Sequence, residues 1–338
     1  MTRRIAINGF GRIGRCIVRA LFERGVSDIE VVAVNDLTSA ETLAHLYNYD
    51  TVHGRAAQRA TARDTGLDIA GRTLRVTAEK DPAQLPWKEL GVDVVLECTG
   101  LFTDKAKASA HLGAGASKVI IGAPAKGQDA TIVLGVNDAD YDPARHTVIS
   151  CGSCTTNCLA PVAKVLLDAF GLERGLMTTT HSYTNDQALL DVPHRKGDLR
   201  RARAAAQNIV PTSSGAARAL SEVLPSLAGR FDGQSMRVPT MDVSLVDLTF
   251  ESTRSLSRES IHAAMRRASE GPMRGILGYT EEPLVSSDYL GDPRSSIFDA
   301  TLTQVVGERF AKVFAWYDNE WGFSNRMIDL ARLVATRR

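Results

Sequence analysis

Residues 7–15 read Ile-Asn-Gly-Phe-Gly-Arg-Ile-Gly-Arg, and this glycine-rich run decides the predicted fold. The apolar run 5–7 before it favours a strand, and apolar residues recur after it, over 16–22, with helical spacing. In such a strand–turn–helix, Gly9 allows the tight turn, Gly11 lets the backbone approach a pyrophosphate, and Gly14 lets the helix pack closely. The N–H groups at the start of the helix would face the phosphates. The run therefore predicts a dinucleotide-binding βαβ unit.

Asp36 indicates which dinucleotide this unit binds. It ends the β-branched run 30–36, which we predict to be the second strand, about twenty residues after the glycines, as the dinucleotide fingerprint requires. A carboxylate at this position accepts hydrogen bonds from the ribose hydroxyls of NAD, whereas it would repel the additional phosphate of NADP. The sequence therefore predicts NAD as the cofactor.

Further strands of the same kind follow along the first part of the chain. Residues 93–98 and 118–121 are near-continuous apolar runs, which are typical of strands buried on both faces of a parallel sheet. Right-handed crossovers between such strands build a doubly wound sheet. We therefore expect an α/β protein that begins with a Rossmann-type domain.

The pattern changes after residue 150. Longer strand candidates lie at 236–250 and 304–317, helix-like runs at 204–228 and 257–270, and a C-terminal helix is predicted at 324–337. These longer strands, with helices between them, favour a second domain of α+β type with a mostly antiparallel sheet. We predict an NAD-binding Rossmann domain over 1–153, completed by the C-terminal segment 319–338, and a catalytic domain over 154–318.

Composition excludes several classes of protein. The chain has 338 residues, 44% of them hydrophobic and 23% charged, which is the mix of a folded protein long enough for two domains. Its formal net charge is only +1, so nucleic acid is not an expected partner. We also expect no membrane span, because no apolar run approaches the ~20 residues that one requires. The chain enters its first strand without a signal-peptide core, and its five cysteines do not suggest a disulfide framework, so we expect a cytoplasmic protein.

A cysteine-containing motif carries the predicted chemistry. Residues 150–158 read Ser-Cys-Gly-Ser-Cys-Thr-Thr-Asn-Cys and precede an apolar helical run, so Cys154 is predicted at or near a helix N-terminus. The helix dipole there stabilises a thiolate and lowers the pKa of the thiol. His181, at the end of a strand-like segment, would be the base or ion-pair partner. Three other interpretations remain open: a redox-active pair of Cys151 and Cys154, half of a zinc site, or structural cysteines. No second Cys-x-x-Cys pair follows, so no metal is expected.

Basic residues form the third signal. The loop-like segment 191–203 is rich in Arg and Lys, and Arg237 stands alone in a strand candidate. Such a run is often only a solvated surface, and nucleic acid is another general interpretation, although no aromatic residues are interleaved. Beside a thiolate and a nucleotide fold, the arginines suit a small phosphorylated substrate. Hydroxyls and a glycine over 212–215, ahead of a helix-like run, are typical of an anion-binding turn.

Five stretches resemble glyceraldehyde-3-phosphate dehydrogenase, and with residues 7–15 they extend over most of the chain: 153–165 (SCTTNCLAPVAKV), 181–187 (HSYTNDQ), 198–211 (DLRRARAAAQNIVP), 275–288 (GILGYTEEPLVSSD) and 316–326 (WYDNEWGFSNR). The resemblance implies a homotetramer that oxidises glyceraldehyde 3-phosphate with NAD and inorganic phosphate to 1,3-bisphosphoglycerate. It implies that Cys154 is the nucleophile, forming a hemithioacetal and then a thioester, and that His181 is its base.

The resemblance also assigns the binding residues. Those around the two phosphates would be Ser153, Thr155, Thr184, Arg201, Ser214, Gly215 and Arg237. Those around the cofactor would be Gly9, Gly11, Arg12, Ile13, Gly14, Asp36, Lys80, Gly122 and Asn319. The segment 191–203 corresponds to a loop that, in this family, reaches toward a neighbouring subunit.

The chain departs from the family pattern beside the nucleophile. Cys151-Gly152 stands where the family usually has Asn-Ala, Gly122 replaces a serine, Phe323 replaces a tyrosine, and Met241-Asp242 replaces Pro-Asn. The first change suggests two hypotheses, a pocket wall that resists thiol-directed inhibitors or a protective Cys151–Cys154 disulfide, while neutral drift stays open. Two alternative enzymes also remain: erythrose-4-phosphate dehydrogenase, and an inhibitor-resistant paralogue of the glycolytic enzyme. Outside catalysis, a redox-sensing or RNA-binding protein with this fold remains the alternative.

Overall fold

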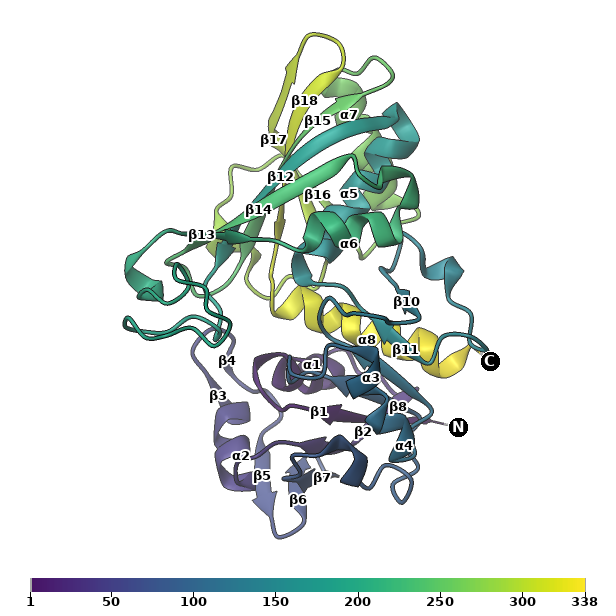
Figure 1. Cartoon of the computed structure of the whole chain (residues 1–338), viewed down its shortest axis with the longest axis vertical. Coiled ribbons are helices and arrows are strands. Elements are labelled where there is room, and N and C mark those ends of the chain that lie inside the picture. Colours follow the sequence, from purple (N-terminus) through teal and green to yellow (C-terminus); the bar gives the residue numbers. More distant parts are fainter. Residues whose placement is uncertain (1, 338) are drawn as a thin grey trace. The chain divides into compact units, whose positions relative to one another are not determined.

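The computed structural model describes residues 2–337, which fold into two compact units. The first unit contains the described residues up to Leu134, residues 138–153, and those from Ser324 onward. The second contains residues 135–137 and 154–323. Each unit is built around a sheet of its own (Figure 1).

The first unit contains a nine-stranded, mostly parallel sheet. In spatial order its strands are β10 (Ala130–Thr131), β11 (Val148–Ser150), β9 (Lys118–Ile121), β8 (Val94–Glu97), β1 (Arg3–Asn8), β2 (Ile29–Asn35), β7 (Arg72–Thr77), β6 (Gly66–Ile69) and β5 (Ala60–Arg63). The six pairs from β10 to β7 are parallel, and the pairs β7–β6 and β6–β5 at one edge are antiparallel. A separate two-stranded pair joins β3 (Tyr49–Asp50) and β4 (Gly54–Arg55).

The central strands are apolar because both faces of the sheet are covered. Apart from Arg3, Arg4 and Lys118 at the strand starts, the side chains of β1, β8 and β9 are buried. The helices of this unit are α1 (Arg12–Glu23), α2 (Ala40–Asn48), α3 (Lys105–Ala108), α4 (Ala110–Gly113) and most of α8 (Trp321–Thr336). Helix α8 is tied to this unit by ion pairs from Arg24 to Asp329, at 2.5 Å, and from Arg332 to Asp28, at 2.8 Å.

The second unit contains a seven-stranded, mostly antiparallel sheet. In spatial order its strands are β13 (Val210–Ser213), β14 (Phe231–Val238), β12 (Leu172–Ser182), β15 (Ser244–Ser252), β18 (Phe310–Tyr317), β17 (Ser296–Val306) and β16 (Leu277–Thr280). Only the pairs β12–β14 and β16–β17 are parallel. The predicted fold class is therefore confirmed, with a mostly parallel sheet followed by a mostly antiparallel one.

Three helices pack along one face of the second sheet: α5 (Cys154–Phe170), α6 (Ala216–Val223) and α7 (Arg258–Glu270) (Figure 1). Burial alternates along β15 and β18, as expected for strands with one covered face. None of the helices in the described part of the chain is long and apolar enough to cross a membrane.

Three sequence predictions about elements of the second unit were wrong. The strand candidate 236–250 is two strands, because Pro239 cannot donate to a ladder and Val243 has a positive φ of 66°. The candidate 304–317 is a hairpin that turns at Gly307, whose φ is 65°. The helix-like run 204–228 also contains strand β13, which pairs along the edge of β14.

Candidate active site

The glycine run forms the turn between β1 and α1. Gly9 has a φ of 92°, and a Cβ there would lie 2.8 Å from the Thr99 backbone nitrogen, so only glycine fits. A Cβ on Gly14 would lie 2.4 Å from the Gly9 carbonyl oxygen, which explains the close packing of the helix on the turn. Gly11 is the N-cap of α1, and a Cβ on it would meet nothing within 4 Å. The turn is therefore open at Gly11, where a pyrophosphate would approach.

The other first-unit residues predicted to bind the cofactor lie as follows. Asp36 follows β2, and its Oδ2 accepts a hydrogen bond of 2.9 Å from the Phe10 N–H, so its carboxylate is held beside the glycine turn. Arg12 is the first residue of α1 and donates to both Asp50 carboxylate oxygens, at 2.6 and 3.1 Å. Ile13 is partly buried in the same turn of helix, and Lys80 is exposed in the loop after β7.

Gly122 directly follows β9, and its N–H donates to the carbonyl oxygen of Glu97, the last residue of β8, at 2.9 Å. A Cβ there would lie 3.3 Å both from that oxygen and from Cε of Met327 on α8. Any larger residue would therefore need Met327 to shift. Glycine in place of the family's serine therefore fits the close approach of Met327 to this position.

In the second unit, the structure brings the predicted nucleophile and base together. Cys154 is the first residue of α5, as predicted, and His181 lies near the end of β12. The Cys154 Sγ is 3.4 Å from the His181 Nε2, and the imidazole is 3% exposed. A thiol and an imidazole at this distance can exchange a proton directly.

Arg237 lies on the other side of the imidazole. β12 and β14 run parallel in a register that pairs His181 with Arg237. The Arg237 Nη1 lies 2.7 Å from the His181 Nδ1, and it donates to the Ser182 carbonyl oxygen at 2.9 Å and to the Thr184 hydroxyl at 3.3 Å. Burial and the positive charge of Arg237 lower the pKa of His181 to about 3, so the imidazole is neutral at physiological pH. A neutral imidazole is the form that can accept a proton.

The electrostatic environment of Cys154 differs from the sequence prediction. Burial raises the pKa of the Cys154 thiol, whereas the charge of Arg237 and the hydrogen bonds from Thr155 lower it. Burial has the largest effect, so the pKa of the thiol is raised overall, although the hydrogen bonds at the start of the helix lower it. The thiol of the free protein is therefore protonated at neutral pH.

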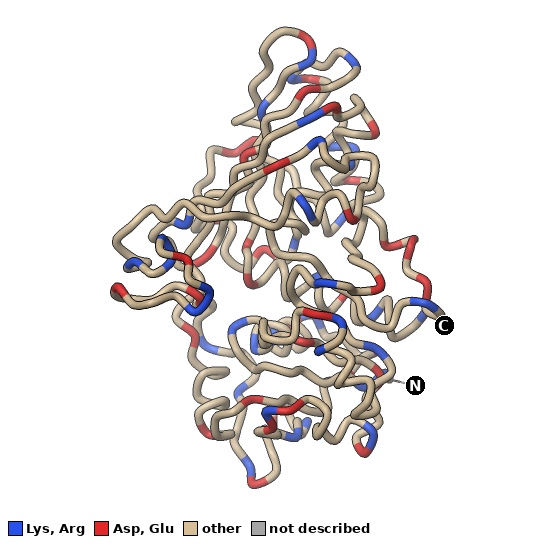
Figure 2. Tube along the Cα trace, in the orientation of Figure 1, with Lys and Arg blue, Asp and Glu red and all other residues tan. Residues whose placement is uncertain are grey.

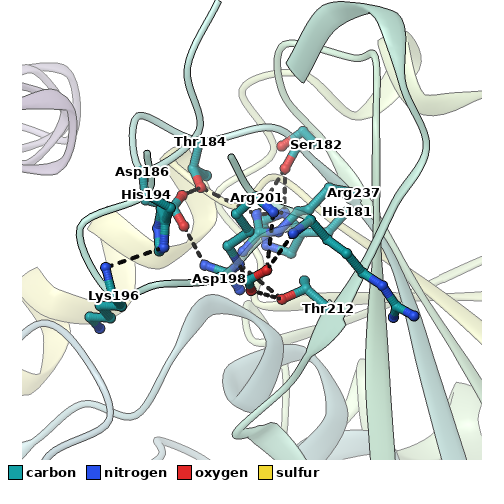
Figure 3. A network of polar contacts seen from close by, with 11 residues as sticks. His181, Ser182, Thr184, Asp186, His194, Lys196, Asp198, Arg201, Thr212 and Arg237 are labelled. Carbon is teal, nitrogen blue, oxygen red and sulfur yellow. Dashed lines mark hydrogen bonds and ion pairs between the residues drawn. The ribbon is translucent and has the colours of Figure 1, made fainter. Parts of the chain in front are cut away.

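A network of polar contacts surrounds the two arginines (Figure 3). The carboxylate of Asp186 accepts hydrogen bonds from the Thr184 hydroxyl and from the Arg201 guanidinium. Burial would raise the pKa of Asp186, but these hydrogen bonds and the nearby arginine charges outweigh it, so the pKa falls. Arg201 also donates to the Thr212 hydroxyl, at 2.9 Å, and lies 3.5 Å from Asp198. The network fixes Thr184, Arg201 and Arg237 relative to one another.

The remaining phosphate-site candidates lie at the starts of two helices. Ser153 directly precedes α5, and Thr155 is its second residue, with its hydroxyl 2.9 Å from the buried Tyr317 hydroxyl. Gly215 is the N-cap of α6, and the Ser214 hydroxyl accepts from the Ala216 N–H at 3.3 Å. The predicted turn of hydroxyls ahead of a helix is therefore present.

Asn319, in the turn before α8, is almost fully buried. Its Oδ1 accepts hydrogen bonds from the hydroxyls of Ser182, at 2.9 Å, and Ser244, at 2.7 Å. The site thus contains a carboxamide with a fixed orientation.

Sequence reasoning missed several residues of this site, among them Ser182, Asp186, Asp198, Ser244 and Tyr317. Asp186 and Ser182 belong to the stretch 181–187, so a local motif gave a signal for them. Asp198 and Tyr317 likewise belong to the stretches 198–211 and 316–326. The contact of Ser244 with Asn319, by contrast, joins distant segments, and no single segment encodes it.

The basic segment 191–203 is not a surface of one charge. Arg203 pairs with Asp191 at 2.8 Å, and Arg201 pairs with Asp186 and Asp198. Figure 2 shows acidic residues among the basic ones here and along both units. This charge pattern fits recognition of small anions better than a nucleic acid surface.

The unusual pair beside the nucleophile has a partial structural explanation. Gly152 has a φ of 70°, a conformation that strains any residue with a Cβ, and its N–H donates to the Ser150 hydroxyl at 3.0 Å. Cys151 is buried, and none of the five cysteines, all of which lie in the described part of the chain, forms a disulfide. The glycine therefore suits the backbone, and nothing in the structure explains the thiol at 151.

Comparison with known proteins covers both units. The model of the glyceraldehyde 3-phosphate dehydrogenase NAD binding domain matches residues 3–105, and the model of that enzyme's C-terminal domain matches residues 153–319. Glyceraldehyde-3-phosphate dehydrogenase 2 of Streptomyces arenae is 57% identical over 336 residues, which cover 99% of each chain. The enzymes of Priestia megaterium and Geobacillus stearothermophilus are 56% and 55% identical over 337 residues, all of this chain and 99% of each relative. With matches over its whole length, the chain belongs to the glyceraldehyde-3-phosphate dehydrogenase family.

Proposed function

We propose that the chain catalyses the oxidation of glyceraldehyde 3-phosphate, with NAD and inorganic phosphate, to 1,3-bisphosphoglycerate. The observation that carries this proposal is the contact of 3.4 Å between the Cys154 Sγ and the His181 Nε2 at the start of α5. An activated thiol is the nucleophile that aldehyde oxidation through a thioester requires.

The chemistry follows from the two side chains. His181 takes the thiol proton as Sγ attacks the aldehyde carbon, and the protonated imidazole then donates to the alkoxide of the hemithioacetal. The base takes this proton back as hydride leaves, for which bound NAD supplies the acceptor, and a thioester remains on Cys154. A phosphate oxygen then attacks the thioester carbonyl, the C–S bond breaks, and the acyl phosphate leaves. The Cys154 N–H, at the positive end of α5, would donate to the developing oxyanion.

Arg237 and Thr184 are proposed to hold the phosphate of the substrate. The Arg237 Nε is buried and has no hydrogen-bond partner among the residues that the structure describes. A buried guanidinium with an unused N–H, beside a threonine hydroxyl, suits a phosphate oxygen. Arg201, Ser153, Thr155, Ser214 and Gly215 are proposed to surround the attacking phosphate.

The two parts of the chain would have different roles, one in binding the cofactor and the other in catalysis. Residues 1–153, completed by 319–338, would bind NAD through the glycine turn, Arg12, Ile13, Asp36, Lys80, Gly122 and Asn319, and residues 154–318 would carry the chemistry. The open space at Gly11 and the fixed Asp36 carboxylate fit such a cofactor. We propose a cytoplasmic enzyme, because none of its five cysteines forms a disulfide in the part of the chain that the structure describes.

We also propose a homotetramer. Leu176, Val306 and Phe310, from three strands of the second sheet, are 67%, 69% and 48% exposed. A groove of about 1060 Å³ is lined by residues of β12, β14, β15 and β18, Leu176 and Phe310 among them. The loop after β12 exposes Leu189, Leu190 and Leu199. Apolar surface of this extent is typical of subunit interfaces. Light scattering of the native chain and of Leu176→Arg should give a tetramer and smaller species respectively; a native monomer would contradict the proposal.

The decisive experiment follows NADH formation from glyceraldehyde 3-phosphate with and without inorganic phosphate. Turnover should require phosphate, disappear in Cys154→Ser, and persist in the matched variant Cys16→Ser, which changes a buried cysteine of α1. Faster turnover of erythrose 4-phosphate, indifferent to inorganic phosphate, would instead assign the chain to that substrate. Absence of turnover on both sugars would refute the proposal.

A further inference from the structure

Asn319 has a carboxamide whose two ends are distinguished by a buried set of hydrogen bonds. The Ser182 N–H donates to the Ser244 hydroxyl oxygen at 3.2 Å. That hydroxyl in turn donates to the Asn319 Oδ1 at 2.7 Å, and the Ser182 hydroxyl donates to the same oxygen at 2.9 Å. Ser182 and Ser244 are 0% and 1% exposed, and Asn319 is 5% exposed. Solvent therefore does not compete for these contacts.

This arrangement is stable for only one orientation of the amide. The Ser244 oxygen already accepts from the Ser182 backbone, so its own hydrogen needs an acceptor, and the Asn319 Oδ1 is that acceptor. If the amide were turned by 180°, its NH₂ group would face two hydroxyl groups whose hydrogens would lose their acceptor in a buried site. A buried donor left without an acceptor destabilises the structure, because it has lost its hydrogen bonds to water. The amide is therefore held with its NH₂ group directed away from both serines.

The backbone of Asn319 is also held in place. The preceding residue, Asp318, accepts from the N–H groups of Glu320, at 2.9 Å, and Trp321, at 2.6 Å, through the same oxygen. Its other oxygen accepts from the Gly291 N–H at 2.8 Å. Both the position and the orientation of the amide are thus set before a ligand arrives.

We propose that Ser182 and Ser244 are positioning residues that fix Asn319 as a hydrogen-bond donor, so that it recognises the carboxamide of the nicotinamide ring through its carbonyl oxygen. This inference rests on the proposed function, in which Asn319 contacts that carboxamide. It implies a selectivity: the site recognises the carbonyl oxygen of the nicotinamide carboxamide and not its NH₂ group. Because the Ser182 carbonyl also accepts from Arg237, the residue that orients this amide adjoins the catalytic base.

An analogue of NAD separates the two ends of the carboxamide. In 3-acetylpyridine adenine dinucleotide a methyl ketone replaces the carboxamide, so the carbonyl acceptor is kept and the NH₂ donor is lost. An Asn319 held as a donor can bind both molecules. An Asn319 free to turn can satisfy NAD in either orientation, because the carboxamide of NAD can turn with it. The analogue is satisfied only by the orientation that presents the Asn319 NH₂ group, so it alone loses affinity when the other orientation becomes populated.

The experiment measures equilibrium binding of the oxidised cofactors by calorimetry, with no aldehyde present. Ser244→Ala and Ser182→Ala should weaken binding of the analogue about 3- to 10-fold more than binding of NAD, as expected for one neutral hydrogen bond. Ser235→Ala is the matched control, since this serine of β14 is equally buried and its hydroxyl has no partner among the described residues. It should leave the ratio of the two dissociation constants unchanged.

Two outcomes would overturn the inference. The first is that Ser244→Ala and Ser182→Ala have the same ratio of dissociation constants, analogue to NAD, as the native protein. The second is that Ser235→Ala changes this ratio as much as they do. If Ser244→Ala does not fold, Ser244→Cys, which has a similar shape and a weaker donor, should show the same preference to a smaller degree. Failure of the proposed function would appear separately, as binding of NAD without turnover of the sugar phosphate.

Discussion

His181 and Arg237 are directly paired across the parallel strands β12 and β14, and the Arg237 Nη1 lies 2.7 Å from the His181 Nδ1. The Nε2 of the imidazole thus faces the thiol of Cys154, and its Nδ1 faces the buried guanidinium of Arg237. The arginine stabilises the neutral form of the base, because a second positive charge beside it is unfavourable. The register of two strands therefore sets both where an anion would bind and how basic the histidine is.

Replacing Arg237 with alanine should change both properties. Loss of the guanidinium should raise KM for glyceraldehyde 3-phosphate by at least about tenfold, as expected for a charge-assisted hydrogen bond. It should also raise the pKa of His181, which burial and Arg237 now lower to about 3. Since His181 accepts a proton only when neutral, the acidic limb of kcat/KM should move to higher pH.

The control for Arg237→Ala is Arg203→Ala, which removes an exposed arginine that pairs with Asp191. It should leave KM and the position of the acidic limb unchanged. An Arg237→Ala profile that overlays the native one would show that the arginine does not influence the base.

Features encoded by contiguous residues could be predicted from the sequence. The turn at Gly9, Gly11 and Gly14 requires glycines at fixed spacing, and the first residue of α5 follows from small polar residues ahead of an apolar run. The buried parallel strands are equally local, because both faces need apolar side chains.

Features set by register could not be predicted in this way. The pairing of His181 with Arg237 needs the alignment of two strands 56 residues apart in sequence, and the contact of Ser244 with Asn319 joins positions 75 apart. The pKa of Cys154 could not be predicted from the local sequence either, because burial of the thiol raises it more than the start of the helix lowers it. Turns inside long apolar stretches, at 239–243 and 307–309, were hidden by the strand-like residues on both sides.

Asp36 should determine the choice between NAD and NADP. Its carboxylate is held by the Phe10 N–H beside the glycine turn, so it cannot easily move away from an added phosphate. Asp36→Ser should lower the ratio of kcat/KM for NAD to that for NADP by about tenfold or more, because both a ribose contact and a repulsion disappear. Asp140→Ser, at an exposed acidic position of the same unit, should not change the ratio. An unchanged ratio in Asp36→Ser would place cofactor selection elsewhere.

Asp242 should destabilise the folded protein at neutral pH. Burial and the neighbouring Asp318 and Glu320 carboxylates raise its pKa well above the ordinary value of 3.8. Between the unfolded and folded pKa values the native state keeps a proton that the unfolded state releases, so stability falls as pH rises through this window. Asp242→Asn keeps the oxygen that accepts from the Val243 N–H, at 2.8 Å, and cannot ionise.

Denaturation of Asp242→Asn and of the native chain at two pH values tests this. At pH 7 the variant should be more stable by more than about 1 kcal/mol, and near pH 4 the two should be nearly equal. Asp140→Asn, at an exposed site, should follow the native chain at both pH values. A difference that is constant with pH would show that Asp242 acts through packing rather than through its proton.

Glu97 should be essential for the rigidity of the glycine turn. Its carboxylate is fully buried and accepts hydrogen bonds from the Asn8 amide, the His111 Nε2, and the N–H and hydroxyl of Thr99. The Trp87 indole donates to the His111 Nδ1 at 2.9 Å, so the ring proton must be on Nε2 and must point at Glu97. All four neighbouring groups are donors, so both oxygens of the Glu97 carboxylate must act as acceptors.

Glutamine at position 97 would replace one of these acceptor oxygens with an NH₂ group that faces other donors. Glu97→Gln should lose roughly 3 kcal/mol of folding free energy, as expected when a buried polar network is broken. It should also weaken NAD binding, because Thr99 packs directly against Gly9. Denaturant unfolding and cofactor titration measure the two effects. Glu89→Gln is the matched control, since that carboxylate is 66% exposed in a surface ion pair with Arg75 and should cost less than about 1 kcal/mol. Equal stability losses in the two variants would mean that the buried carboxylate does not hold the turn.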